Sequence, residues 1–405
     1  MQRLSLLRIT AVALVAFAMS AARADALVDW NVRAGQILSD ARVGTPVAVR
    51  TMALVQTATL AAIEALDRQR PHGARTVSSV AVEAAIAAAH RTVLLKQVPA
   101  QKAAIDAAYE AALAALPDGA HRRGGIAAAE RAAAMVFSAR ANDLPGAVDN
   151  YRPHTTAGAY VPTVTPAAYG WTQRKPWLMA RADQFRPAPP PSLDSKAWER
   201  DYNEVKSLGA KASTARSAEQ TEIARFWEYS LPPIYFGVVR SVAQMPGRDV
   251  GRNARLYAAA AQAMDDAMVA VFDAKYHHAF WRPVTAIRNG DTDGRDDTMR
   301  DATWAPLIEA PMHPEYPSGH AILAAAVGTV IKADLGSSPG PELSTSSPTA
   351  GGATRRWQSI DQFVREVAES RVLAGIHFRT AVEVGMAMGE QIGALAAQRL
   401  LSEPH

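Results

Sequence analysis

A chain of 405 residues is long enough for one large domain or two ordinary ones, and its hydrophobic content of 49% and charged content of 20% are typical of a globular protein. It contains no cysteine, which excludes disulfide bonds, thiolate metal sites and thiol catalysis. The formal net charge of +4 is too small to indicate a nucleic-acid partner.

The first 24 residues have the pattern of a secretory signal peptide. Arg3 and Arg8 form a basic start, residues 9–21 are apolar, and small residues precede a cleavage site before Asp25. Their removal takes away three arginines and no acid, which leaves a formal charge of +1. The signal peptide predicts a periplasmic or secreted protein. No later run reaches about 18 consecutive apolar residues, so we expect that the mature form does not span a membrane. An uncleaved membrane anchor is the alternative.

Residues 25–142 are rich in alanine and are predicted to be helical. Apolar residues recur there at spacings of three and four, which is the period of an amphipathic helix. The pattern predicts helices over residues 45–66, 78–97, 101–116 and 125–141. Proline- and glycine-containing breaks at residues 70–73, 99 and 117–119 separate them.

Residues 143–195 change character, because proline recurs throughout them. A structureless linker between two domains is the first interpretation of such a segment. Tyr160, Trp171 and Trp177 are among the aromatic residues that argue against it, since a solvated linker is poor in aromatic side chains. We therefore expect an irregular segment wrapped over a single domain that covers residues 25–405. Its three parts would be N-terminal helices over 25–142, the proline-rich segment over 143–195 and a catalytic helical core over 196–405.

Helical periodicity resumes after this segment. It predicts helices over residues 196–208, 219–229, 254–280, 359–373 and 381–401, with a further helix after Ser318. Residues 334–354 are rich in serine, glycine and proline and are predicted to be irregular. Because neither β periodicity nor an internal repeat is evident, the predicted fold class is all-α.

Three short segments of the C-terminal part combine cations with serine and histidine. They read Lys275-Tyr-His-His-Ala-Phe-Trp-Arg282-Pro283, Pro317-Ser318-Gly319-His320 and Ser370-Arg371-Val-Leu-Ala-Gly375-Ile-His377. Lys275 and Arg282 are seven residues apart, close to two helical turns, so both would project from one face of a helix that stops before Pro283.

The other two segments place their polar residues at helix ends. Ser318 directly precedes an apolar run and is predicted to cap a helix, where free N–H groups and the helix dipole attract an anion. Gly375 is predicted to end a helix, with Arg371 in its last turn and His377 in the loop beyond. Each segment alone is more often a solvated helix face, an ordinary cap or a loop histidine. Together, three cations, a hydroxyl, a backbone N–H and two imidazoles suit a tetrahedral oxyanion.

The ordered set resembles the signature K-x6-R-P, P-S-G-H and S-R-x5-H-x3-D of the vanadium-dependent haloperoxidases and the related type 2 phosphatidic acid phosphatases. The resemblance favours the bacterial haloperoxidase-like branch, because it extends beyond the signature and covers most of the mature chain. The additional stretches are residues 184–191, 219–227, 281–288 and 313–320. This resemblance implies a helical bundle with a four-helix core around the oxyanion, plus long irregular wrapping segments.

The resemblance also implies roles for the matching residues. Those that would bind orthovanadate are Lys275, Arg282, Ser318, Gly319, Arg371 and His377. His377 would be the ligand of the vanadium atom, the three cations would neutralise the oxygens, and the hydroxyl and backbone N–H would donate to them. His320 would transfer protons and Lys275 would polarise the peroxide, so His320, His377 and Lys275 form the implied catalytic set. Hydrogen peroxide would then oxidise a halide to a hypohalous species.

The signature is broken at Ala381, which stands where the family has an aspartate that orients the histidine. Without that aspartate His377 would lean on a backbone carbonyl or another acid, and Glu383 is the hypothetical substitute. His313 stands where the family lines the halide side of the pocket, and an imidazole there favours bromide or iodide over chloride. A surface histidine between two prolines is the alternative for His313.

Three functions are compatible with these residues. The first is an exported vanadate-dependent haloperoxidase. The second is a periplasmic acid phosphatase of the same superfamily, which would need no cofactor; His377 would attack the phosphorus of a phosphate ester and His320 would protonate the leaving group. The third is a catalytically silent oxyanion-binding protein, which the absence of the aspartate keeps open. The sequence does not indicate an oligomeric state.

Overall fold

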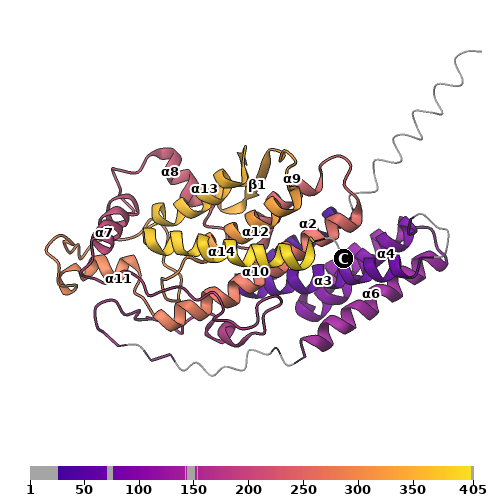
Figure 1. The fold of residues 1–405 in the computed structure, drawn as a ribbon, viewed down its shortest axis with the longest axis horizontal. Coiled ribbons are helices and arrows are strands. Elements are labelled where there is room, and N and C mark those ends of the chain that lie inside the picture. The colour runs from indigo at the N-terminus through magenta and orange to yellow at the C-terminus, as the bar shows by residue number, and fades with distance from the viewer. Residues whose placement is uncertain (1–25, 71–75, 142, 144–150, 153, 403–405) are drawn as a thin grey trace, which may run out of the picture. The chain divides into compact units, whose positions relative to one another are not determined.

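The computed structural model describes residues 26–70, 76–141, 143, 151–152 and 154–402, and the predicted signal peptide lies outside them. Within these residues the chain is mostly helical, with a single two-stranded sheet (Figure 1). The prediction of an all-α fold class is therefore confirmed.

The described residues group into two compact units. The N-terminal unit comprises residues 26–41, 54–136 and 243–254, and the C-terminal unit comprises residues 42–53, 137–242 and 255–402. The long helices α3 and α10 each contribute to both units. The expectation of a single domain over residues 25–405 stays a prediction.

The N-terminal unit is built from closely packed alanine-rich helices. They are α2 (Ala26–Asp40), the larger part of α3 (Thr45–Arg68), α4 (Ser79–Gln97), the 3-10 helix η2 (Pro99–Gln101), α5 (Lys102–Ala114) and α6 (Ala120–Ala139). A Cβ atom on Gly125 would come within 2.1 Å of the Ala81 carbonyl oxygen, so α4 and α6 approach backbone to backbone. Small side chains explain the composition of this region, because larger ones would hold these helices apart. The predicted helices are present, although α6 begins earlier than expected and α2 was not predicted as a separate helix.

Helix α3 is long and apolar enough to cross a membrane by length and composition alone. In the structure 78% of its most apolar 18-residue window is buried. A buried core helix passes the same test, so α3 is only weak evidence for a membrane span.

The C-terminal unit contains the remaining helices, wholly or in large part. They are α7 (Lys196–Leu208), α8 (Ala218–Phe226), α9 (Pro232–Ala243), α10 (Val250–His278), α11 (Pro283–Arg288), α12 (Gly319–Leu335), α13 (Ile360–Leu373) and α14 (Arg379–Leu400), with the 3-10 helices η3 (Tyr169–Gln173), η4 (Gly290–Thr292) and η5 (Pro348–Ala350). In this unit Ser217 forms a capping box with Gln220, and Ser359 accepts a hydrogen bond from the Gln362 N–H.

Helices α12 and α14 form the tightest pair of this unit and run side by side (Figure 1). Gly385, Gly389 and Gly393 repeat every four residues along one face of α14. A Cβ atom at these glycines would come within 2.7, 2.3 and 2.6 Å of carbonyl oxygens of α12 or its cap. The glycine stripe thus allows close backbone contact, which holds the N-terminal end of α12 against that of α14.

The prediction of an irregular segment over residues 334–354 is wrong in part. Strand β1 (Leu343–Ser347) pairs with β2 (Ala353–Trp357) in an antiparallel hairpin, with Leu343 opposite Trp357. Alternate residues of β1 are buried, and Ser347 donates a 2.6 Å hydrogen bond to the Phe226 carbonyl. The inward positions hold threonine and serine as well as leucine, so hydrophobic alternation does not mark this strand.

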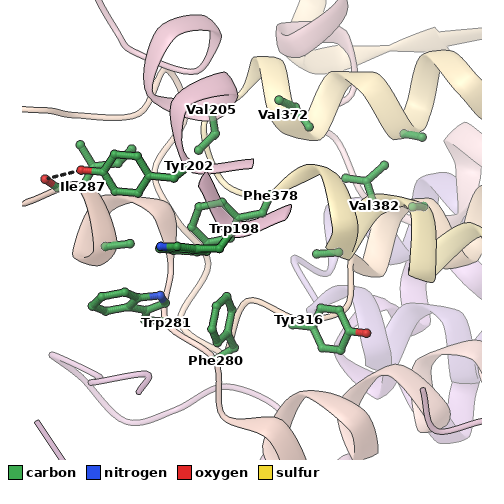
Figure 2. Packing of buried hydrophobic residues seen from close by; sticks show 14 of the residues in the cluster. Trp198, Tyr202, Val205, Phe280, Trp281, Ile287, Tyr316, Val372, Phe378 and Val382 are labelled. Atoms are coloured by element: carbon green, nitrogen blue, oxygen red, sulfur yellow. Dashed lines mark hydrogen bonds between the residues drawn. The ribbon is translucent and has the colours of Figure 1, made fainter. Parts of the chain in front are cut away.

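An aromatic cluster centred on Trp198 lies between α7, the segment before α11 and the start of α14 (Figure 2). The Trp198 ring stacks on Trp281 with ring centroids 5.8 Å apart and meets the edge of Phe378 at 4.9 Å. Trp281 directly precedes Arg282, and Phe378 directly follows His377. The cluster therefore sets the relative positions of two residues that the sequence analysis selected.

The described part of the proline-rich segment is anchored on α10 and its C-terminal extension. The Asp266 carboxylate accepts hydrogen bonds from the backbone N–H groups of Trp177, Leu178 and Met179, at 2.6 to 2.8 Å. Just beyond the C-terminal end of α10, Phe280 forms a β-bridge with Ala159 of the segment. These contacts place the segment next to the residues around Arg282.

Candidate oxyanion site

Lys275 lies in the last turn of α10 and is completely buried. Its ammonium group donates to the carbonyl oxygens of Pro314, Glu315 and Pro317, at 3.0, 2.8 and 2.5 Å. Three carbonyl acceptors require the three N–H bonds of the charged form. Burial, followed by the charge of Arg282, lowers the pKa of Lys275 well below its usual value. Lys275 therefore anchors the loop before Ser318 with all three of its N–H bonds.

Arg282 does not extend the helix that carries Lys275, so the prediction that both project from one helical face is wrong. Helix α10 ends at His278, Ala279 has a left-handed backbone with φ of 48°, and Arg282 is the extended N-cap of α11. The guanidinium is buried and donates to the carbonyl oxygens of His313 and Ile376, at 2.9 and 2.8 Å. Burial lowers the pKa of Arg282 to about 10, so it stays charged at neutral pH.

Ser318 caps α12, as predicted, but its side chain takes no part in the cap. The Ser318 N–H donates to the Ala381 carbonyl at 2.9 Å, while the buried hydroxyl has no hydrogen-bond partner among the described residues. His320 follows in the first turn, and its buried Nε2 atom also lacks a partner in that part of the chain. A hydroxyl and an imidazole nitrogen at a helix N-terminus are thus left unpaired, which is the arrangement an anion would complete.

Arg371 and His377 lie on either side of a tight backbone crossing. Arg371 is in the last turn of α13, and Gly375 follows with φ of +77°, as the sequence predicted for a helix terminator. A Cβ atom on Gly375 would come within 2.3 Å of the Gly209 carbonyl oxygen, so only glycine fits there. Arg371 donates to the Trp227 carbonyl at 2.6 Å, and burial lowers its pKa to about 10.

Glu315 supports His377, and sequence reasoning missed it. Its Oε1 atom accepts hydrogen bonds from His377 Nδ1 at 2.7 Å and from the Phe378 N–H at 3.0 Å. The hypothesis that Glu383 replaces the missing aspartate is wrong, because Glu383 is exposed on α14. The one available signal was that Glu315 is an acid within the Pro314–His320 stretch, 62 residues before His377.

The Glu315 contact assigns the tautomer of His377. Glu315 Oε1 already accepts from the Phe378 N–H and the other carboxyl oxygen has no partner among the described residues, so Oε1 acts as the acceptor towards His377 as well. The Nδ1 atom therefore carries the proton and the Nε2 atom keeps its lone pair. Consistently, Arg282 Nη1 lies 3.4 Å from His377 Nε2 and can only donate. Burial, and after it the charges of Arg282 and Lys275, lower the pKa of His377 well below its usual value, so the ring is neutral. Burial raises the pKa of Glu315 to about 7, against the opposing effects of Lys275 and Arg282.

His313 is oriented by Arg282 and does not stand free on the surface. Arg282 Nη2 lies 2.9 Å from His313 Nδ1, and the Pro314 carbonyl oxygen lies 3.2 Å from the same atom. The contact with Arg282 is the shorter one and a guanidinium only donates, so we assign Nδ1 as the acceptor and Nε2 as the atom that carries the proton. The edge of the His313 ring meets Phe272 with centroids 5.3 Å apart. Burial and the nearby cations lower the pKa of His313 well below its usual value, so it offers a neutral N–H donor.

These groups surround the bottom of a cavity of about 500 Å³. Lys275, Gly319, His320 and His377 line it directly, together with His313. Arg282 does not line the cavity itself but contacts His377, which does. Burial lowers the pKa of both His320 and His377, and the charge of Arg371 lowers both further. The structure therefore brings together the three segments that the sequence analysis selected.

The residues present fit an oxyanion such as vanadate or phosphate. Two guanidinium groups and an ammonium group are buried in one cluster, where Glu315 is the carboxylate that faces Lys275 and Arg282. Buried cations in excess of their counterions are costly unless an anion joins them. The unpaired Ser318 hydroxyl and the His377 Nε2 lone pair supply the hydrogen-bond donor and the ligand that such an anion needs.

Comparison with known proteins finds a family model that matches part of the C-terminal unit. Residues 255–403 match the family model described as the VCPO second helical-bundle domain. These residues are therefore similar to that helical-bundle domain, which agrees with the resemblance seen in the sequence.

Individual relatives extend the likeness to the rest of the fold. The chain is 30% identical over 198 residues to vanadium chloroperoxidase of Curvularia inaequalis. This match covers 40% of this chain and 31% of that protein, so it spans less than a third of the relative. The crystal structure of the first bacterial vanadium-dependent iodoperoxidase superposes with a TM-score of 0.73 at 22% identity, over 93% of this chain and 96% of that one. An apo-type bacterial vanadium-dependent chloroperoxidase gives 0.72 at 19% identity, over 89% and 94%. The fold of the described residues is thus similar to that of these two bacterial proteins.

Proposed function

We propose that this protein is an exported vanadate-dependent haloperoxidase that uses hydrogen peroxide to oxidise a halide. The observation that carries the proposal is the hydrogen bond between His377 and Glu315. It leaves the His377 Nε2 lone pair beside Arg282, in a cavity that Lys275 also lines. A neutral imidazole with a defined tautomer is the form in which histidine binds a metal.

Vanadate, when bound, would activate hydrogen peroxide for the two-electron oxidation of a halide to a hypohalous acid, with water as the second product and one proton consumed. Lys275, Arg282 and Arg371 would offset the charge of the anion, and Ser318 and Gly319 would donate hydrogen bonds to it. His320 would hold or deliver the proton at its unpaired Nε2 atom. His377 would supply its Nε2 lone pair, with Glu315 holding the ring in place.

The preference for bromide or iodide is part of the proposal, and the cavity walls support it. Chloride is the most strongly hydrated of the three halides, so it loses most on entry into a largely apolar cavity. His313 offers a neutral N–H donor there and not an additional charge. We expect His313→Phe to lower kcat/KM for bromide about tenfold while kcat at saturating bromide changes less. Unchanged kcat/KM for all three halides would remove His313 from halide binding.

The test is a paired assay on the purified mature protein, stripped of bound oxyanions and then supplied with orthovanadate. Bromination of a phenolsulfonephthalein dye by bromide and peroxide is followed beside the hydrolysis of p-nitrophenyl phosphate. Dye bromination that requires vanadate and is lost in His377→Ala is the expected result. Phosphate release that vanadate inhibits, without bromination, would identify an acid phosphatase that needs no cofactor and acts on phosphate esters. Neither activity, with vanadate still bound, would identify a silent oxyanion-binding protein.

Export has its own test, because the relevant residues lie outside the described part of the chain. We propose cleavage before Asp25. N-terminal sequencing of protein recovered from the periplasm or the medium should begin at that residue. Intact Met1 on a membrane-bound product would indicate an uncleaved anchor instead.

A further inference from the structure

We propose that the cavity above the oxyanion site binds a planar aromatic acceptor, uncharged or anionic, and that the acceptor is halogenated while bound. The halogenation step rests on the proposed function, whereas the binding of the aromatic molecule does not.

The size of the cavity is the first argument. Peroxide and a halide are each comparable in size to a water molecule, whose share of liquid volume is about 30 Å³. The cavity measures about 500 Å³, which lies within the range of sites for organic ligands. Most of its volume is therefore surplus to the needs of peroxide and halide, and an organic molecule of one or two rings would fill it.

The chemistry of the walls is the second argument. Trp171, Met268, Val271, Phe272, Leu323 and Ile376 line the cavity and are all buried. Flat aromatic and thioether surfaces suit a planar ring. Thr45 and Ser230, which also line it, hydrogen-bond to each other at 2.6 Å and so make little polar demand on a ligand.

Charge is the third argument. The residues that line the cavity all lie in the described part of the chain, and they include Lys275 and three histidines but no aspartate or glutamate. A cationic ligand would meet Lys275 at the bottom without a carboxylate to offset its charge. A neutral phenol or its anion is compatible with the same surroundings.

Access is the fourth argument. Gly44, Val47 and Ala167 line the cavity and are exposed, whereas Val271, Lys275 and His377 at its inner end are buried. An aromatic molecule can thus enter past the first turn of α3 and reach the imidazoles with its leading edge. Hypohalous acid released at the inner end would then meet a ring carbon before it meets bulk water. The carbon–halogen bond forms there, and the displaced ring proton leaves with the hydroxyl group as water.

Binding is tested first, on the full mature protein without peroxide or halide. Isothermal titration with 1-naphthol should show saturable binding of one molecule per chain, with Kd below about 1 mM, both with and without orthovanadate. The cationic analogue 1-naphthylmethylammonium should bind about tenfold more weakly or not at all. Absence of saturable 1-naphthol binding would overturn the proposal.

A pair of variants locates the binding site. Val47 is 38% exposed at the rim, and Val164 is 53% exposed but does not line the cavity. We expect Val47→Trp to weaken 1-naphthol binding about tenfold, while the control Val164→Trp leaves both binding and dye bromination as in the parent. Because both positions are exposed, both variants should fold. Equal affinities in the two variants would place any bound 1-naphthol elsewhere.

The product pattern tests whether the bound ring is the one that reacts. Bromination of 1-naphthol yields 2- and 4-bromo isomers, and we expect their ratio to differ about threefold from that given by free hypobromous acid. In Val47→Trp the ratio should return to that of the free reagent.

Dye bromination without 1-naphthol binding would leave the proposed function standing and overturn the acceptor site. Binding without bromination of either compound would leave the aromatic site standing and overturn the haloperoxidase proposal. Binding with the isomer ratio of the free reagent would show that halogenation takes place in solution.

Discussion

At the scale of single residues, sequence motifs selected most of the residues of the candidate oxyanion site but missed the carboxylate that contacts His377. Lys275, Ser318 and His377 were recognisable because each lies in a short motif or at a helix end. Glu315 contacts His377 across 62 residues of sequence, and such a pairing depends on how α12 and α14 meet. The substitute proposed from the sequence, Glu383, was chosen for its nearness along the chain, but helical geometry turns it to the surface.

The first residue-scale prediction separates these two acids. Glu315→Gln should weaken vanadate binding about ten- to a hundredfold, because the amide no longer dictates which His377 nitrogen carries the proton. Equilibrium dialysis of vanadate against the purified variant measures the change. Glu383→Gln is the matched control, and its vanadate affinity should equal that of the parent. The reverse pattern would restore Glu383 as the supporting acid.

The second residue-scale prediction concerns Ser318, whose hydroxyl caps nothing. An N-cap serine ordinarily contributes about 1 kcal/mol to the free energy of unfolding. Because Ser359 accepts a cap hydrogen bond, Ser359→Ala should lower this free energy by that amount. Ser318→Ala should change it by less than about 0.5 kcal/mol. Vanadate affinity should fall about tenfold in Ser318→Ala and stay constant in Ser359→Ala. Urea unfolding and vanadate titration of both variants provide the four measurements. A large loss of stability in Ser318→Ala would make its role structural.

At the scale of elements, helices with strong apolar periodicity were predictable and those that depend on tertiary contacts were not. The predicted range 196–208 coincides with α7, and α13 lies within the predicted range 359–373. Helix α9 begins with two prolines, which suggest a break although proline is tolerated in a first helical turn. The β1–β2 hairpin is held by contacts such as that of Ser347 with Phe226, which no local pattern encodes.

The element-scale prediction concerns the contact between α12 and α14. Gly389→Ala should lower the free energy of unfolding by about 1–3 kcal/mol, because its Cβ atom would meet the Ile322 carbonyl oxygen, which is backbone and cannot rotate away. Gly124→Ala on α6 is the matched control, since its Cβ atom would meet nothing within 4 Å. It should stabilise the protein by about 0.5–1 kcal/mol through helix propensity. Thermal unfolding of both variants would show the opposite signs, and a stabilised Gly389→Ala would contradict the close packing.

At the scale of the whole molecule, the two units differ in what their buried polar groups do. In the C-terminal unit Lys275 and three histidines line a cavity of about 500 Å³. In the N-terminal unit a buried histidine, His90, belongs to the core. It bonds to the Ile86 carbonyl at 2.8 Å and lies beside Trp30, with ring centroids 5.3 Å apart. Motifs in the sequence distinguished His320 and His377 from His90, but the burial of His90 arises from the tertiary fold and is not marked by its local sequence.

His90 makes the stability of the N-terminal unit depend on pH. Burial lowers the pKa of His90 from 6.5 to about 4, so between these values the unfolded chain binds the proton and the folded chain does not. The contribution of neutral His90 to the free energy of unfolding is therefore fully present above pH 6.5. It is lost as the pH falls towards 4, by about 3 kcal/mol in total. In His90→Met this part of the pH dependence should be absent. The free energies of unfolding that urea titrations give at pH 7 and at pH 4.5 should therefore differ less in this variant than in the parent. His121→Met, at an exposed position of α6, is the control and should keep the parent's pH dependence. If His90→Met unfolded with the parent's full acid sensitivity, the loss would have to arise from other groups, and His90 would not be the acid-sensitive element of this core.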